Sequence, residues 1–385
     1  MRILAVAHES GMNGGANRSL FTVINLLRQH YSVDVDVVVP KENGEFVEAL
    51  RKAGINVYFQ PYKCDFSVYR YSPKDLLKWI YVRYINLHNM LLAKRTKSMF
   101  SNCIYDIIYV NTRMSSYGAF LAKELNIPLV CHIREIGDPH AIWGCWTLRM
   151  IGRYSKKVIA ISTVMKEIIQ EKIPESKVIA ILNGIDCNHV ESITDNFTQN
   201  NINILLTGRV VAAKGHMDAL KAVFELKQRG YNNLMLHIAG SISDSTNGIK
   251  YYESLKTYAM EHNIDDNVKF LGEVNNIFEL RKNMAIELMC AICEPFGRVT
   301  VEAMRSGLLV IGSNTGGTLD IIKDGESGLL YSQGDYISLA DKIEWAIINE
   351  EDRKKIQEYG RRYSIDHFTK EENVEKIYAT LKSVI

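Results

Sequence analysis

The stretch from Cys290 to Gly307 reads CAICEPFGRVTVEAMRSG. Its pattern predicts the end of an apolar strand, a tight loop over residues 294–297, and an amphipathic helix from about Val299. A strand-to-helix junction presents free backbone N–H groups and the positive end of a helix dipole, which suit an anion. Glu294 and Glu302 frame this junction. Because carboxylates repel phosphate, we expect them to accept hydrogen bonds from sugar hydroxyls, and the combination favours a nucleotide sugar.

The two glutamates also carry a family resemblance. Glu294 and Glu302 stand eight positions apart, enclose PFGRVTV and are followed by AMRSG. This segment resembles the paired-glutamate motif of the retaining glycosyltransferases of family 4. The resemblance implies an α/β protein of GT-B fold, with two Rossmann-like domains facing a central cleft that closes to assemble the site. It also implies transfer of a sugar from a nucleotide diphosphate sugar with no metal or other cofactor.

The length of 385 residues predicts two domains, since one core rarely grows so large. We expect an N-terminal acceptor domain over residues 1–186, ending in the sequence NGID, and a linker over residues 187–201, where Asn, Thr, Asp and Ser dominate. A donor domain follows over residues 202–360. The tail over residues 361–385 resembles the helices that cross back to the first domain in this family.

Composition and charge indicate a soluble globular protein. Hydrophobic residues make up 47% and charged residues 23% of the chain. Residues 1–185 carry 24 Lys and Arg against 15 Asp and Glu, so this half is basic although the net charge of the chain is only +2. No apolar run reaches membrane-spanning length, and seven scattered cysteines fit reduced thiols. We therefore expect a cytoplasmic protein.

The first domain opens as a Rossmann-like unit. Residues 2–7 are predicted to form a strand, and a glycine-containing loop leads to a helix from about Ala16. The loop lacks the GxGxxG fingerprint. Gly14 and Gly15 instead resemble the family's N-terminal glycine pair, which lets the backbone approach the donor. An ordinary turn is the alternative interpretation.

A basic and aromatic segment spans residues 63–97. Between Lys74 and Lys97 there are six Lys or Arg and one acidic residue. At helical spacing, one apolar stripe is predicted, formed by Leu77, Ile80, Tyr84 and Leu91. Such a helix suits an anionic lipid headgroup layer, so we expect the protein to be peripheral on the inner face of the membrane or to grip a lipid-linked acceptor. A helix packed on its own domain is the alternative, and the absence of any nucleic-acid motif argues against nucleic acid.

His132 lies at the carboxyl end of the predicted strand over residues 128–133. Ligands usually bind at that edge of an α/β sheet. The family places an active-site histidine after this strand, so the resemblance implies that His132 contacts the donor sugar, whereas a lone histidine is otherwise more often structural. Arg134, Glu135 and Asp138 follow it and are candidates for acceptor contacts.

Arg209 and Lys214 lie in the loop GRVVAAKG, which follows a predicted strand over residues 203–207. They resemble the family's basic pair that clamps the donor diphosphate, Arg as a fork and Lys as a point charge. A coincidence of surface charge is the alternative.

Several glycines are expected to allow close backbone approach. Gly272 lies in the loop after a predicted strand over residues 268–271 and resembles the part of the fold that holds the base, and we favour uridine on family frequency. Gly316 and Gly317 precede another predicted helix start, again where a backbone could approach a ligand.

The resemblance implies a division of roles within this site. Arg209, Lys214 and the backbone near Arg298 would stabilise the departing nucleotide diphosphate. Glu302 would hold the ribose, and Glu294 the donor sugar. The expected donor-contacting segment comprises Glu294, Phe296, Gly297, Arg298, Val299, Thr300 and Glu302. We identify no convincing nucleophile, so front-face attack by the acceptor is favoured.

Two other classes remain open. A non-catalytic nucleotide-sugar binding module would keep the diphosphate clamp but lose His132 and Glu294. A nucleotide-sugar epimerase of the same architecture would act without an acceptor, so analysis of the product separates it. A phosphorylase would ordinarily be a much longer chain with pyridoxal phosphate. The favoured function is transfer to a glycan or lipid-linked acceptor in cell-surface polysaccharide synthesis.

Overall fold

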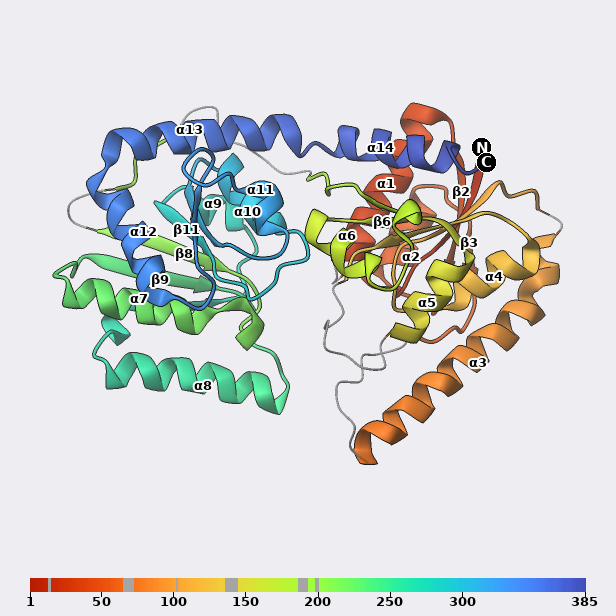
Figure 1. Cartoon of the computed structure of the whole chain (residues 1–385), viewed down its shortest axis with the longest axis horizontal. Helices are drawn as coiled ribbons and strands as arrows, with labels where there is room; N and C mark the ends of the chain where they lie inside the picture. Colours follow the sequence, from red (N-terminus) through yellow and green to blue (C-terminus); the bar gives the residue numbers. More distant parts are fainter. Residues whose placement is uncertain (13–14, 65–72, 102, 136–144, 186–192, 198–200) are drawn as a thin grey trace. The chain divides into compact units, whose positions relative to one another are not determined.

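The computed structural model describes residues 1–12, 15–64, 73–101, 103–135, 145–185, 193–197 and 201–385. The chain divides into two compact units (Figure 1). The first comprises Met1–Gly184 together with Lys370–Ile385, and the second comprises Ile185–Thr369. Each unit is an α/β structure with its own parallel sheet, as the sequence predicts.

The described residues of the first unit form a seven-stranded sheet in the order β3-β2-β1-β4-β5-β6-β7, and every strand pair is parallel. The strands are β1 Arg2–Val6, β2 Asp34–Val39, β3 Val57–Phe59, β4 Ile107–Val110, β5 Leu129–Ile133, β6 Ser155–Ala160 and β7 Val178–Ala180. The helices are α1 Gly15–Tyr31, α2 Glu45–Lys52, α3 Pro73–Ser101, α4 Tyr117–Leu125, α5 Cys145–Tyr154, α6 Thr163–Gln170 and α14 Lys370–Lys382.

The central strands of this sheet are buried on both faces. In β1, Ile3 and Ala5 enter a core cluster with side chains of α1, α2 and α14, while Leu4 and Val6 are equally buried on the opposite face. Parallel strands covered on both sides read as continuous apolar runs, which explains the sequence of β1. Ile3 is aligned with Ile107 of β4, so these two strands end at the same edge.

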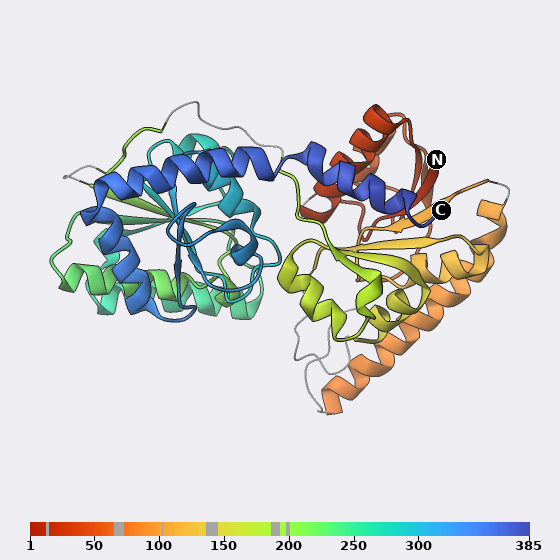
Figure 2. The same cartoon turned by 45° about the horizontal axis from the view of Figure 1, so that its top comes forward.

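Helix α14 completes the first unit although it comes from the end of the chain (Figures 1 and 2). Its residues Val374, Ile377 and Leu381 belong to the same buried cluster as β1. The ring of Tyr378 stacks on Tyr31 of α1 at 4.0 Å between centroids.

Helix α3 is the longest helix that the structure describes and runs along α4 on the outside of the first unit (Figures 1 and 2). One face is buried and anchored by polar contacts. Thr96 lies 2.9 Å from the hydroxyl of Tyr117, and the Asn89 amide donates to Ser116. Within the described residues, neither this helix nor any other combines the length and apolar character that crossing a membrane requires.

The second unit contains a six-stranded parallel sheet in the order β10-β9-β8-β11-β12-β13. Its strands are β8 Ile202–Thr207, β9 Leu234–Ala239, β10 Val268–Gly272, β11 Ile286–Met289, β12 Leu309–Ser313 and β13 Leu329–Tyr331. Its helices are α7 His216–Gln228, α8 Thr246–Glu261, α9 Ile277–Arg281, α10 Arg298–Arg305, α11 Thr318–Ile321, α12 Tyr336–Ile348 and α13 Glu350–His367.

Strand order fixes where each unit can carry a site. In the second sheet the order reverses between β8 and β11, which are paired with Ile204 opposite Ile286. In the first sheet the reversal lies between β1 and β4. Loops that leave the carboxyl ends of strands at a reversal diverge and leave a crevice, so ligands of α/β sheets bind there.

The chain returns to the first unit at Lys370, nine residues later than the sequence suggested. The reason is that α13 continues to His367 and its end is held by Arg305, whose guanidinium donates to the carbonyls of Ser364 and Phe368. Within the expected linker, residues 187–192 and 198–200 lie outside the described residues. Asp195 pairs with buried Arg353 of the second unit at 3.0 Å.

Candidate active site

Lys214 and Glu294 form a direct ion pair in the second unit. Lys214 Nζ lies 2.6 Å from Glu294 Oε2. The first residue follows β8 and the second follows β11, the two strands at the reversal of the sheet. The loops are joined by backbone contact, since a Cβ on Gly215, whose φ is +69°, would fall 1.9 Å from the Cys290 carbonyl oxygen. Glycine is therefore required next to Lys214.

The loop that carries Glu294 is held from its other side by Gly316. The N–H of Gly317 donates to the Glu294 carbonyl at 2.7 Å. Gly316 has φ of +58°, and a Cβ there would lie 2.5 Å from the same carbonyl oxygen. These two glycines thus let the backbone of the Glu294 loop approach closely, and the approach of a ligand to them stays a prediction.

The N-terminus of α10 is open. Its N-cap is Gly297, which has no side chain to cap the helix. The N–H groups of Arg298 and Val299 donate to no described residue. The hydroxyl of buried Thr300 also lacks a hydrogen-bond partner among the described residues. Three donors at the positive end of a helix dipole therefore lack a partner among the described residues, an arrangement that suits an anion.

Glu302 lies in the second turn of α10 and is tethered from inside the unit. Its Oε2 accepts a hydrogen bond from Arg281 Nη1 at 3.3 Å, and its Oε1 lies 3.7 Å from Arg298 Nη2. Arg281 is in turn bonded to Glu287 of β11. The sequence pattern did not predict a role for Arg281 or Glu287. A charged residue inside the apolar strand at 286–289 is the signal that could have found them.

Two further predicted residues lie at the same edge of the sheet. Arg209 directly follows the β8 strand end, is exposed, and makes no hydrogen bond or ion pair with the described residues. Its guanidinium is therefore open to solvent. Gly272 ends β10, has φ of +66°, and would meet no atom within 4 Å if it carried a Cβ. Phe296 is fully buried and packs edge-on against Phe368, so its side chain anchors the loop over residues 294–297 to the core of the second unit.

His216 is a further residue for which the sequence pattern did not predict a place near this site. It opens α7 two positions after Lys214 and is completely buried. Burial lowers the pKa of His216 to about 4, although the carbonyls of Val211 and Gly208 offset part of this effect. His216 is therefore neutral at neutral pH, and adds no charge to the site.

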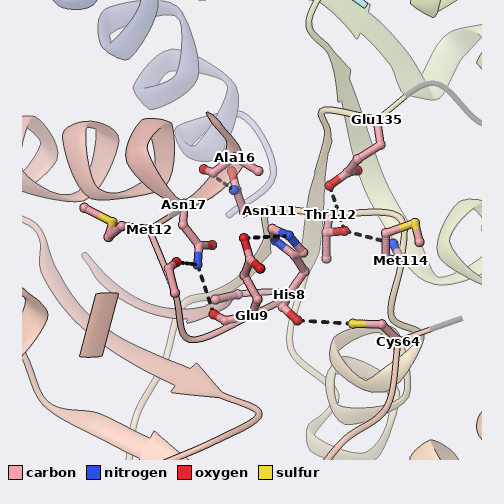
Figure 3. A network of polar contacts seen from close by, with 12 residues as sticks. His8, Glu9, Met12, Ala16, Asn17, Cys64, Asn111, Thr112, Met114 and Glu135 are labelled. Atoms are coloured by element: carbon pink, nitrogen blue, oxygen red, sulfur yellow. Dashed lines mark hydrogen bonds and ion pairs between the residues drawn. The ribbon is translucent and has the colours of Figure 1, made fainter. Parts of the chain in front are cut away.

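In the first unit, a polar network joins the loops after β1, β4 and β5 (Figure 3). The Asn17 amide donates to the carbonyls of Glu9 and Gly11, which closes the loop after β1. The Asn111 amide donates to the Ala16 carbonyl at 2.9 Å, so this loop is fixed to the loop after β4. The sequence analysis did not identify Asn17 or Asn111.

His132 is completely enclosed at the end of β5. Its Nδ1 lies 2.6 Å from the Tyr109 hydroxyl and 3.3 Å from Arg134 Nη2. Because guanidinium only donates, Nδ1 must accept, and the ring proton sits on Nε2. That Nε2 has no partner among the described residues. Burial, and then Arg134, hold the pKa of His132 well below its usual range, so His132 is a neutral donor.

Arg134 has a different surrounding from the one expected of an acceptor contact. Its side chain is only 7% exposed, and it donates to Asn111 at 2.7 Å and to Asn183 at 2.6 Å. A guanidinium enclosed in this way holds Asn111, Asn183 and His132 in place, and acceptor contact by Arg134 stays a prediction.

Glu135 and Gly15 are the other predicted site residues of the first unit that the structure describes. Glu135 is partly exposed and accepts from the Thr112 hydroxyl at 3.0 Å and from the Arg113 N–H at 3.3 Å (Figure 3). Gly15 is the exposed first residue of α1. Gly14 and Asp138 lie outside the described residues.

Comparison with known proteins identifies the family. Residues 192–363 match the family model described as glycosyl transferases group 1, and residues 13–189 match the model of glycosyltransferase family 4. Together the two models take in nearly the whole chain. The chain belongs to the group 1 glycosyltransferases. Its fold is GT-B, as the resemblance implied.

Two curated relatives illustrate the family. A capsular polysaccharide biosynthesis glycosyltransferase, CapM of Staphylococcus aureus, is 28% identical over 58% of this chain and 61% of its own length. The chain thus spans less than two thirds of that relative. An undecaprenol-linked glycan α-1,4-N-acetyl-D-galactosaminyltransferase of Campylobacter jejuni is 23% identical over 93% of this chain and 94% of its own length.

Solved structures share the fold over the full chain. The HepE protein of Anabaena, crystallised with UDP, superimposes with a TM-score of 0.79 at 22% identity and full coverage of both chains. A glycosyltransferase of Rickettsia africae superimposes with a TM-score of 0.75 at 21% identity, covering 100% of this chain and 98% of that one.

Proposed function

We propose that this group 1 glycosyltransferase is a retaining enzyme that moves a sugar from a UDP-sugar to a glycan or lipid-linked acceptor. The observation that carries the proposal is the open N-terminus of α10 beside the Lys214–Glu294 pair. Helix N–H groups and an ammonium offer anion contacts, while Glu294 next to them offers an acceptor for hydroxyls. A diphosphate and a sugar can therefore share this edge of the sheet.

The chemistry follows from charge. Cleavage of a glycosyl phosphate bond leaves negative charge on the nucleotide diphosphate, which Lys214, Arg209 and the N–H groups of Arg298 and Val299 would stabilise. Removal of one preorganised donor of this kind typically lowers the rate about 10²- to 10³-fold. The same cations would supply the charge that a divalent metal provides elsewhere, so we propose metal-independent catalysis. Turnover that is unchanged by EDTA is expected, and loss of turnover restored by Mg²⁺ would contradict this point.

Glu294 and a donor phosphate would repel one another, and Lys214 offsets this repulsion. Its ammonium lies on Glu294 at 2.6 Å, and its aliphatic stem passes 3.6 Å from where a Gly208 side chain would begin. We propose that this cation screens the charge of Glu294 from an anion that reaches the loop. We assign Glu294 to the donor sugar and Glu302 to the ribose on this basis together with the family resemblance.

The nucleotide is proposed to be UDP. HepE, which shares this fold, has been crystallised with UDP and with UDP-glucose. A thermal-shift panel of UDP, GDP, ADP and their sugars, followed by turnover without an acceptor, tests donor choice and reaction class together. Stabilisation by UDP and slow release of free sugar support the proposal. An isomerised nucleotide sugar would instead support the epimerase alternative, and binding without any turnover would support a non-catalytic module.

Retention is proposed on the family resemblance, and front-face attack by the acceptor is proposed because the sequence offers no convincing nucleophile to work with Glu294. Proton NMR of the first-formed product settles the point, since an α-linked donor should give an α-linked product. A β-linked initial product would contradict retention. His132 is proposed to contact the donor sugar, and His132→Ala should lower turnover while UDP still binds.

The acceptor side is proposed to lie at an anionic membrane. The exposed face of α3 carries eight large apolar side chains, each 45–68% exposed, namely Leu76, Leu77, Ile80, Tyr81, Tyr84, Leu87, Leu91 and Met99. Exposed Arg83, Lys94 and Arg95 lie on the same helix. An apolar face with cations beside it suits the headgroup layer of anionic lipid. The Campylobacter relative, named for an undecaprenol-linked substrate, is consistent with such a surface.

Liposome co-sedimentation tests this surface. The protein should sediment with phosphatidylglycerol vesicles at low salt and be released as salt rises. Replacing Leu77, Ile80 and Leu87 by Ser should weaken binding at least about tenfold, because each buried leucine contributes about 1.5–3 kcal/mol. The matched control replaces Met260 and Ile348, exposed apolar residues of the second unit, by Ser. Equal binding by both variants would contradict the assignment to α3.

A further inference from the structure

Arg281 joins a buried carboxylate to the one that we assign to the ribose. It ends α9 and is 2% exposed, beside Glu287 of β11, which is 1% exposed. Its Nε and Nη2 donate to the two Glu287 oxygens at 2.7 and 3.1 Å. The remaining Nη1 donates to Glu302 Oε2 at 3.3 Å.

The geometry of the Arg281 guanidinium fixes the direction of its hydrogen bond to Glu302. Two parallel hydrogen bonds to Glu287 set the plane of the guanidinium, so Nη1 can point only toward α10. Burial disfavours the charge on Arg281, but Glu287 and Glu302 outweigh this and raise the pKa of the guanidinium above its usual value. The cation and Glu287 neutralise one another. Glu302, at 20% exposure, is the member of the group that reaches the surface.

We propose that Arg281 is a positioning residue for ribose recognition, and that Glu287 acts through it. A glutamate on a helix surface samples several rotamers, and binding must then restrict them. Arg281 anchors one carboxylate oxygen of Glu302 in advance, which leaves the outward lone pairs aimed at the 2′- and 3′-hydroxyls of a nucleoside diphosphate. This inference rests on the proposed function, which assigns Glu302 to the ribose.

Arg281 and Glu287 would also be important for folding if their role were structural alone. The test must therefore measure ribose recognition directly. Arg281→Met by itself would strand Glu287 as a buried unpaired charge and endanger the fold. The main variant is therefore Arg281→Met/Glu287→Leu, since apolar residues of similar volume often replace a buried ion pair without loss. Arg281→Lys is the second variant, because it keeps a cation for Glu287 but cannot form the fork.

Glu302→Gln serves as the positive control. The matched negative control is Arg229→Met/Glu344→Leu, which removes another Arg–Glu pair of the same unit, 2.6 Å apart in the structure. Calorimetry measures the dissociation constants of UDP and 2′,3′-dideoxy-UDP, and of GDP and 2′,3′-dideoxy-GDP. The ratio within each pair reports ribose recognition separately from diphosphate binding.

The wild type should prefer UDP over its dideoxy form by at least about tenfold, as expected for hydrogen bonds to a charged group. Both Arg281 variants should lose most of this ratio, as should Glu302→Gln, while binding of dideoxy-UDP and the control pair stay unchanged. If Glu302→Gln loses the ratio of the dissociation constants but both Arg281 variants keep the wild-type ratio, the role of Arg281 is overturned and the proposed function stands. If the wild type binds neither nucleotide, or shows no ratio, the donor site itself is wrong and the inference falls with it.

Discussion

Lys214 and Glu294 place opposite charges 2.6 Å apart at the reversal point of the second sheet. In the proposed function the pair divides two tasks between neighbouring atoms, because the ammonium would attract phosphate while the carboxylate would accept hydrogen bonds from hydroxyls. Each side chain should therefore fail in its own way when it is removed.

Lys214→Ala should weaken UDP binding and lower turnover by about 10²- to 10³-fold. Glu294→Ala should abolish transfer but retain UDP binding, since the cation remains. Lys282→Ala is the matched control, because Lys282 pairs with Glu279 at 2.7 Å on the surface of the same unit. Calorimetry and steady-state kinetics on all three variants give the comparison. Full activity in Glu294→Ala would remove its assigned role.

His216 makes stability depend on pH. Its pKa is about 4 in the folded protein against 6.5 for an ordinary histidine. Below pH 6.5 the unfolded chain binds a proton at His216 that the folded chain does not bind. The stability that the folded protein gains from a neutral His216 is therefore complete at neutral pH and is lost as pH falls toward 4. The free energy of unfolding should drop by about 2 kcal/mol from this residue between pH 7 and pH 5. Urea unfolding of the wild type and of His216→Gln at both pH values measures it. An equal drop in both proteins would contradict the prediction.

At the scale of elements, α10 combines an uncapped N-terminus with an unpartnered hydroxyl on Thr300. In most helices a side chain satisfies such groups. Here the strand-to-helix junction leaves them without a partner among the described residues, and in the proposed function the donor diphosphate satisfies them.

Thr300→Val should separate these two effects. Removal of a buried hydroxyl without a partner should stabilise the unliganded protein by about 1 kcal/mol, while UDP should bind less tightly because one donor is gone. Thermal unfolding with and without UDP measures both changes. Thr22→Val, at an exposed hydroxyl of α1 that bonds to the Arg18 carbonyl, is the control. A variant that is less stable without UDP yet binds it normally would contradict this assignment.

The sequence predicts elements of this kind well and contacts between them poorly. The apolar run, the Glu294 loop and the amphipathic helix after it are all local patterns, so the strand, loop and helix around α10 were predictable. The pairing of Lys214 with Glu294 joins residues 80 positions apart. It depends on β8 and β11 becoming neighbours, which no local pattern reports. The burial of Arg134 was not predictable for the same reason, since Asn111 and Asn183 enclose it only in the folded sheet.

At the scale of the whole molecule, the C-terminal segment from Lys370 to Ile385 is part of the first unit. Helix α14 contributes Val374, Ile377 and Leu381 to the core of the first unit. The family resemblance predicted this return. Its starting point, Lys370, was not predictable because the helical pattern of α13 shows no break near Arg361.

Ile377→Asp should therefore destabilise the first unit although the residue follows the entire second unit in sequence. Burying a charge at this site, with loss of the core side chain, should cost at least the 2–5 kcal/mol typical of a core deletion. Hydrogen exchange of β1 and β2 should accelerate, whereas amides of β8 and β11 should be unaffected and UDP should still bind. Ala379→Asp, on the exposed face of α14, is the control. Unchanged exchange in β1 would contradict the role of α14.

The most direct test of the account as a whole is a crystal structure of the protein with UDP bound. The account predicts that the diphosphate contacts the N–H groups of Arg298 and Val299 together with Lys214 and Arg209, and that both ribose hydroxyls contact Glu302. A structure in which the diphosphate lies away from Lys214 and the N-terminus of α10 would contradict it.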